Sequence, residues 1–177
     1  MTGAVARRYA RALFALATEE GSQEQIGRGL AEASDAFSQA PLKAFAENTS
    51  LDRKIRRAVV KQVGQAGEMP RSLANFLGVL AENNRLTALA SIAVEYGRLE
   101  DRRLGRVRAT LKSARPLSDE SRSRIHDALE RRTAKRVIAE DVIAAELLGG
   151  VVVEIQGRVF DGSVRTRLER LKRSLVG

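Results

Sequence analysis

The sequence predicts a mainly α-helical protein with a small α+β part at its C-terminal end, and three observations predict it. Apolar residues recur every three or four positions through residues 1–105, which is the period of amphipathic helices. After Gly105 the period changes to two, as in a strand. A glycine-rich stretch, residues 147–168, then combines a β-hairpin pattern with a capped helix. We therefore expect an N-terminal six-helix bundle in residues 1–105 and a C-terminal α+β domain in residues 106–177.

The first expected helix, residues 4–20, is apolar on two sides. Tyr9 and Leu13 belong to one side, and Phe14 belongs to the other. A helix in a bundle usually shows a single apolar stripe. The wider apolar surface indicates either central burial of this helix or one face reserved for a partner, and the sequence leaves both alternatives open.

Five further helices are expected before Gly105. Ser22 with Gln25 forms a capping-box pattern for the second helix, and prolines begin the third and the fifth. Ser50 is expected to cap the fourth helix. The expected apolar stripe of the fourth helix is Leu51, Ile55, Val59 and Val63. That of the sixth is Leu86, Leu89, Ile92, Ala93, Tyr96 and Leu99.

The C-terminal part alternates strand and helix patterns. Strands are expected over residues 107–111 and 136–139, with a helix capped by Ser118 between them. Residues 151–155 and 158–160 read as a hairpin around Gly157. Residues 161–163 supply a turn and an N-cap for a terminal helix. Its expected stripe is Val164, Leu168, Leu171 and Leu175.

The composition excludes several kinds of chemistry. The chain has no cysteine, which rules out disulfides and thiolate metal sites and is typical of a reducing compartment. It has no phosphate-binding glycine loop of the common kinds. His126 is the single histidine, and we expect Asp127 and Glu130 beside it to lie on a solvated helix face. Asp161 is better explained by its turn than by catalysis. The sequence therefore predicts no catalytic residue, no cofactor and no metal site.

The net charge of +9 indicates an acidic partner. Residues 106–177 carry most of it, with 16 basic against 10 acidic residues, while residues 1–105 carry 15 against 12. The basic residues of 106–177 suggest nucleic-acid binding as an alternative function. Phe160, however, is the only aromatic residue in that part of the sequence for stacking on bases. No apolar run approaches the roughly 20 residues that span a bilayer, so we expect a soluble, cytoplasmic protein.

The glycine-rich stretch resembles the C-terminal signature of the delta subunit family of F-type ATP synthases, which includes the mitochondrial oligomycin-sensitivity-conferring protein. Residues 8–14 and 75–86 also resemble family segments, in the right order, so the resemblance covers the whole chain. Two departures affect backbone positions: Ala144-Ala145 replaces a frequent Asp-Pro, and Asn83-Asn84 replaces Asn-Gly. The signature residues are Gly149, Gly150, Gly157, Asp161, Gly162 and Ser163.

The resemblance implies a non-catalytic peripheral-stalk subunit, a stator, of a proton-translocating ATP synthase. It implies one copy per complex at the cytoplasmic face of the cell membrane, with no direct contact to lipid or nucleic acid. In the family, the helical bundle binds the N-terminal helix of an alpha subunit between its first and fifth helices, which here are the helices around Tyr9 and Phe76. The C-terminal domain binds the end of a b-type stalk subunit.

Carried over to this sequence, the resemblance gives a set of expected partner contacts, although core packing competes for each of them. The contacts are Val5, Tyr9, Ala12, Leu13, Leu16, Val79 and Glu82. The alternative function is a nucleic-acid-binding or regulatory helical adaptor that uses the basic C-terminal domain. Salt separates the two functions, because affinity for phosphates falls steeply with salt concentration.

Overall fold

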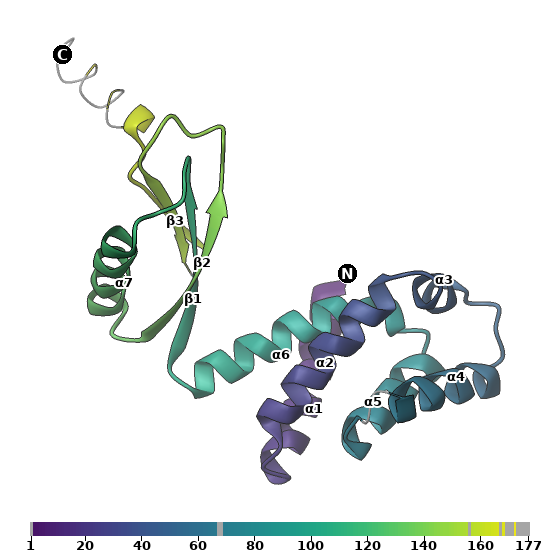
Figure 1. Ribbon diagram of the computed structural model, residues 1–177. Helices are drawn as coiled ribbons and strands as arrows, with labels where there is room; N and C mark the ends of the chain where they lie inside the picture. The colour runs from purple at the N-terminus through teal and green to yellow at the C-terminus, as the bar shows by residue number, and fades with distance from the viewer. Residues whose placement is uncertain (1, 67–68, 156, 167, 169–171, 173–177) are drawn as a thin grey trace. The chain divides into compact units, whose positions relative to one another are not determined.

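The computed structural model describes residues 2–66, 69–155, 157–166, 168 and 172. The chain forms two compact units, Met1–Glu100 and Asp101–Gly177, and each is described by itself (Figure 1). The first unit is helical and the second combines a sheet with helix. This agrees with the predicted mainly helical fold with a small α+β part, whereas the arrangement of the first unit as one six-helix bundle stays a prediction.

The helical unit consists of helices joined by short turns. Its elements are α1 Thr2–Glu19, α2 Gln23–Ser38, α3 Leu42–Glu47, α4 Arg53–Ala66, α5 Arg71–Glu82, the 3-10 turn η1 Leu86–Ala88 and α6 Leu89–Arg103. The last residues of α6 belong to the second unit, where the buried Asp101 accepts a hydrogen bond from Arg108 at 2.6 Å.

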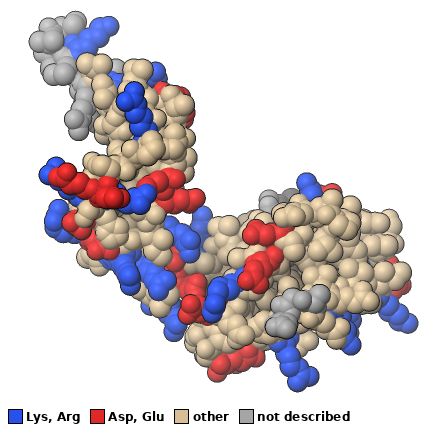
Figure 2. Space-filling view, in the orientation of Figure 1, with Lys and Arg blue, Asp and Glu red and all other residues tan. Residues whose placement is uncertain are grey.

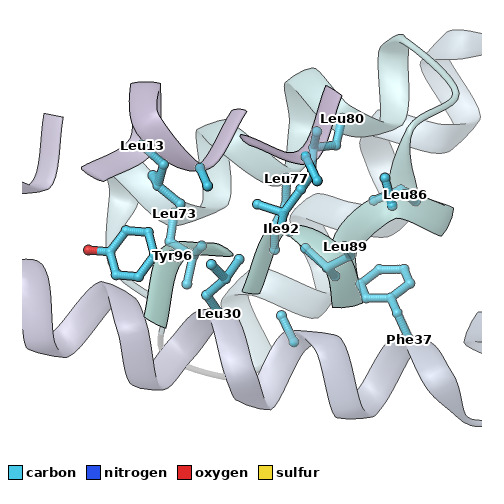
Figure 3. Packing of buried hydrophobic residues seen from close by; sticks show 14 of the residues in the cluster. Leu13, Leu30, Phe37, Leu73, Leu77, Leu80, Leu86, Leu89, Ile92 and Tyr96 are labelled. Carbon is cyan, nitrogen blue, oxygen red and sulfur yellow. The ribbon is translucent and has the colours of Figure 1, made fainter. Parts of the chain in front are cut away.

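One apolar core holds these helices together. Figure 3 shows leucines of α1, α2 and α5 pointing toward α6, where Ile92 and Tyr96 lie. The Tyr96 ring packs edge to face on Phe14, with ring centroids 5.3 Å apart. Its hydroxyl donates to the carbonyl of Gln23 at 2.9 Å, so the buried phenol keeps a hydrogen-bond partner. The core therefore joins residues from both ends of the unit.

The expected apolar stripe of α4 is wrong at Ile55, which is 52% exposed. The neighbouring Arg56 and Val60 are each only 1% exposed, so the inward face is shifted by one residue. The expected Ser50 cap is wrong as well. Asp52 Oδ1 accepts from the Lys54 amide at 2.7 Å, which starts the helix later than expected.

The capping box expected at the start of α2 does not form. Ser22 occupies the N-cap position, but its hydroxyl bonds the carboxylate of Glu20 instead of the helix. The Ser118 cap is confirmed, since its Oγ accepts from the Ser121 amide at 3.3 Å. Of these two serine caps, only the one at Ser118 forms as expected.

The second unit is a four-stranded mixed sheet with one helix packed against it. Its elements are β1 Arg106–Ser113, α7 Asp119–Thr133, β2 Arg136–Ile143, β3 Val151–Ile155 and β4 Arg158–Asp161. The strand order is β2-β1-β3-β4; β2 runs parallel to β1, and the other neighbours are antiparallel. Parallel neighbours need a crossover, and α7 supplies it.

Helix α7 covers one face of the sheet (Figure 1). The core beneath it consists of Val107, Ala109, Leu111, Leu129, Val137, Val153 and Ile155. Strand β3 and strand β4 confirm the predicted hairpin. Of the expected terminal stripe, Val164 and Leu168 are helical, and Leu171 and Leu175 lie outside the described residues. In the described parts of the chain, no helix has the length and apolar character needed to cross a membrane.

Candidate partner-binding surfaces

Helix α1 leaves one apolar row uncovered. Its inner positions include Ala10 and Leu13, which are at most 1% exposed. On the outer side, Leu16 is 39% exposed. The outer row is Val5 and Tyr9, which are half-buried, and Ala12 and Leu16, which are exposed. One side of α1 thus packs in the core and the other side faces outward, and the use of the outer side by a partner stays a prediction.

The structure joins this outer row to α5. Tyr9 and Phe76 pack edge to face with ring centroids 6.1 Å apart and an interplanar angle of 73°. The Arg8 guanidinium lies 5.4 Å from the centre of the Tyr9 ring. Both rings are only partly buried, so the contact between the two helices reaches the surface here. Leu13 lies beneath this surface, in the core, and not on it.

Val79 and Glu82 lie on a different feature, a cleft of about 710 Å³ between α4 and α5. Val79 is 46% exposed there, and Glu82 pairs with Arg57 at 3.3 Å. Lys61 and Arg71 also line the cleft, so three of its four charged lining residues are cations. The sequence reasoning missed this cleft. The available signal was the set of small residues Gly64, Ala74 and Gly78, which line the cleft without filling it.

The glycine signature of the second unit allows two segments, residues 149–151 and 162–164, to contact each other through their backbones. The Val164 amide donates to the carbonyl of Gly149, and the Gly162 amide donates to that of Val151, each at 3.0 Å. A Cβ on Gly150 would lie 2.5 Å from the carbonyl oxygen of Gly162, and its φ is 83°. Only glycine fits both conditions.

Asp161 and Ser163 organise the turn that follows. Asp161 Oδ1 accepts from the Ser163 amide at 2.8 Å, and its Oδ2 accepts from Thr166 Oγ1 at 2.7 Å. Ser163 Oγ in turn accepts from the Thr166 amide at 3.3 Å, as an N-cap does. These side chains fix the chain path from the hairpin into the last helical segment and do not form a catalytic group.

The family model for the ATP synthase delta (OSCP) subunit matches residues 5–175. The chain belongs to this family. It is similar to "ATP synthase subunit delta" of Anaeromyxobacter dehalogenans (strain 2CP-1), at 38% identity over 176 residues, which cover 99% of this chain and 98% of that protein. It is also 37% identical to the protein of that name from Myxococcus xanthus (strain DK1622), over 97% of this chain and 96% of the relative.

A solved structure agrees with this result. A chain in the Toxoplasma gondii mitochondrial ATP synthase hexamer matches with a TM-score of 0.72 and 25% identity, covering 97% of each chain. Delta-family membership makes the chain a non-catalytic, peripheral-stalk subunit of F-type ATP synthase, with the stator role. It is associated with a membrane-bound complex through that role.

Several basic residues of the second unit contact acidic or aromatic side chains within the chain. Arg122 pairs with Asp141, Arg124 pairs with Glu120 at 2.7 Å, and both charge signs are interspersed in the surface view (Figure 2). The Arg132 guanidinium lies 4.6 Å from the centre of the Phe160 ring. Phe160 therefore stacks on an arginine and the core and is not a free platform for bases.

The solvated helix face expected for Asp127 and Glu130 is wrong for Glu130, and His126 beside it also contacts the sheet. His126 Nε2 donates to the carbonyl of Val137 at 2.9 Å, and Glu130 Oε1 accepts from the amide of Val137 at the same distance. Both side chains thus join α7 to β2, because the strand backbone offers one donor and one acceptor side by side. Asp127 is exposed, as expected. Among the described residues, no cluster of acidic or histidine side chains has a metal-binding arrangement.

Proposed function

We propose that the helical unit, as a six-helix bundle, binds the N-terminal helix of an alpha subunit of the catalytic head, and that the α+β unit binds the end of a b-type stalk subunit. One copy of the chain then links head and stalk at the cytoplasmic face of the membrane. Family membership supports both partners, because the stator role requires a connection between the static parts of the enzyme.

The observation that carries the first contact is the outer row of α1 beside the Tyr9–Phe76 pair. Val5, Tyr9, Ala12 and Leu16 recur at spacings of four, three and four, so they form one continuous stripe on the helix. An amphipathic partner helix uses anchors at the same spacing. The stripe is apolar yet uncovered in the chain alone, and a docked helix would remove it from water.

The second contact is supported by the charge of the C-terminal part, where residues 106–177 have a surplus of six positive charges. An acidic or polar coiled coil complements such a surface. The unit is small, and a small domain gains stability from a partner.

Two separate contacts suit a stator. Torque from the rotor acts on the head during each turn, so each contact needs slow dissociation and not chemistry. Linking the two contacts through one chain raises the effective concentration for the second after the first has formed. The joint therefore resists sideways load better than either contact alone.

The test is a calorimetric titration of the full chain with a synthetic peptide of the alpha subunit's N-terminal helix, at about 50 and 200 mM salt. We expect binding at both concentrations. Tyr9→Asp should weaken it at least about tenfold, because a carboxylate in an apolar groove is costly to desolvate. Ala15→Asp is the matched control, since Ala15 is an exposed residue of the same helix, and it should bind as the unchanged chain does.

Two results would contradict the proposal. If Tyr9→Asp lost thermal stability in proportion to its lost affinity, Tyr9 would be a core residue and not a contact. If the peptide failed to bind at either salt concentration, the α1 surface would not be the alpha site. Tight binding of DNA that collapses between the two salt concentrations would then favour the nucleic-acid alternative.

A further inference from the structure

Strand β2 forms one edge of the sheet and is long for an edge strand. It pairs with β1 alone over eight consecutive residues, and the register shows no bulge. The opposite edge, β4, has only four residues. Proteins usually protect long edges with proline, lysine, bulges or a covering element, because unpaired backbone groups attract another strand. Residues 137–143 contain no proline, no lysine and no bulge, and their charged side chains are Glu140 and Asp141.

The hydrogen bonds at the two ends of β2 show which backbone groups face outward. The Arg136 amide donates to the carbonyl of Gly105 at 3.2 Å, and the Ala144 amide donates to that of Ser113 at 2.9 Å. In a parallel pair every second residue points its N–H and C=O to the neighbour. Even-numbered residues of β2 therefore pair with β1, and odd-numbered residues direct both groups to the open edge.

Only the first outward residue of this edge is covered within the described chain. His126 and Glu130 of α7 satisfy the carbonyl and amide of Val137. For the next outward residues, Ala139 and Asp141, the described residues supply no backbone partner at the edge. Helix α7 thus covers the backbone edge at the start of β2, and its Arg122 pairs with the side chain of Asp141, but the outward backbone groups of Ala139 and Asp141 have no partner among the described residues.

The side chains around the open edge define what would fit there. Ile138 and Val142 are 36% and 37% exposed on the sheet face away from α7, and Ile143 is 54% exposed. Glu140 lies between Ile138 and Val142 on the same face, exposed, and it makes no ion pair with another described residue. An added strand would therefore meet an apolar, an acidic and again an apolar position.

The charges argue against one arrangement of a second copy as the added strand. An antiparallel pairing of two β2 edges centred on residues 140 and 141 would bring acidic residues opposite each other, and like charges opposite each other destabilise a sheet. A basic residue on a different protein would instead meet Glu140 favourably.

We propose that β2 accepts an extended segment of a partner protein as a fifth strand, with two apolar side chains flanking a lysine or arginine that faces Glu140. Backbone hydrogen bonds to Ala139 and Asp141 supply affinity, and the alternate side chains supply selectivity. This contact is separate from the α1 surface and does not depend on the alpha or b-type partner proposed above.

The probe is a capped synthetic peptide of alternating valine and threonine with a central lysine, titrated into the full chain while amide exchange is followed by NMR. In the free chain the amides of Ala139 and Asp141 should exchange quickly, and those of Ile138 and Glu140 should be protected by β1. Bound peptide should protect Ala139 and Asp141 at least tenfold. A peptide with the same side chains but N-methylated backbone should bind at least tenfold more weakly.

Reversing the charge of Glu140 gives a variant that keeps the backbone hydrogen bonds between β1 and β2. Glu140→Lys should reverse the preference, so that a glutamate-centred peptide binds better than the lysine-centred one. Four results would each overturn the proposal: no binding of the lysine-centred peptide at millimolar concentration, equal binding of the N-methylated peptide, an unchanged preference in Glu140→Lys, and protection of Ala139 and Asp141 in the free chain. If that last protection disappeared on dilution, the occupant would be a second copy.

Discussion

Arg56 of α4 is a charged residue whose side chain is buried. It is 1% exposed, and its Nε and Nη1 atoms have no hydrogen-bond partner among the described residues. Nη2 donates to the carbonyl of Asn48, which links α4 to the end of α3. A buried cation with one neutral acceptor keeps much of its desolvation cost.

We expect Arg56→Met to leave the fold intact and to change the free energy of unfolding by between zero and about +2 kcal/mol, because an apolar side chain of similar length avoids that cost. Urea denaturation followed by circular dichroism measures the change. A loss of more than about 2 kcal/mol would show that Arg56 has a strong partner.

Ala134 has a backbone conformation that glycine adopts more easily than alanine does. It follows α7 at φ 51°, in the left-handed region, where its amide donates to the carbonyl of Glu130 at 2.8 Å. Glycine is the usual residue at this position because a Cβ costs about 1 kcal/mol there. Asn84, at φ 55°, also has a left-handed φ after α5, but asparagine tolerates it.

Ala134→Gly should therefore raise the free energy of unfolding by about 0.5–1 kcal/mol, and Asn84→Gly should raise it by less. The same urea experiment compares the two variants. A larger gain at Asn84 than at Ala134 would contradict this account of the two helix ends.

At the scale of elements, the glycine signature is explained by the contact between two turns. Residues 149–150 precede β3 and residues 162–163 follow β4, so the contact closes the base of the hairpin. The contact carries no chemistry of its own. Its function is to position the hairpin and the chain that leaves it.

Gly150→Ala should destabilise the chain by at least about 3 kcal/mol, because a Cβ 2.5 Å from a backbone oxygen adds a steric clash to the left-handed strain. Gly157→Ala is the matched control: Gly157 has φ 76° but no atom within 4 Å of the added Cβ, so it should cost only about 1–2 kcal/mol. Thermal melting and urea denaturation measure both. Equal costs would show that the close approach does not matter.

The helices and strands also show how much of the fold the sequence predicted. Helix and strand existence followed from the periodicity, as in β1 and the β3–β4 hairpin. The α4 stripe failed because Arg56 is buried and Ile55 is not, and no propensity argument anticipates a buried arginine. The parallel pairing of β2 with β1 could not be predicted either, because it depends on contacts between residues distant in sequence.

The candidate partner surface was predicted in part. The outer stripe of α1 follows from its spacing, and Tyr9 does meet Phe76. By its spacing Leu13 belongs to the same stripe, but in the structure its side chain is buried in the core. The cleft that holds Val79 and Glu82 depends on the space that small residues leave between α4 and α5, which spacing along one helix does not reveal.

At the scale of the whole molecule, the chain has two compact units with separate apolar cores. The uncovered α1 stripe belongs to the first unit and the basic surplus to the second. A linker between two static parts of the synthase needs this division, because each partner must bind without displacing the other.

The central claim is that one chain holds both partners at once. The most direct measurement mixes the full chain with a fluorescent peptide of the alpha N-terminal helix and a fragment of the b-type stalk, and follows the complex by size-exclusion chromatography. The account predicts that peptide and stalk fragment elute together only when the chain is present, and that Tyr9→Asp releases the peptide while the stalk fragment stays bound. Displacement of one partner by the other would contradict it.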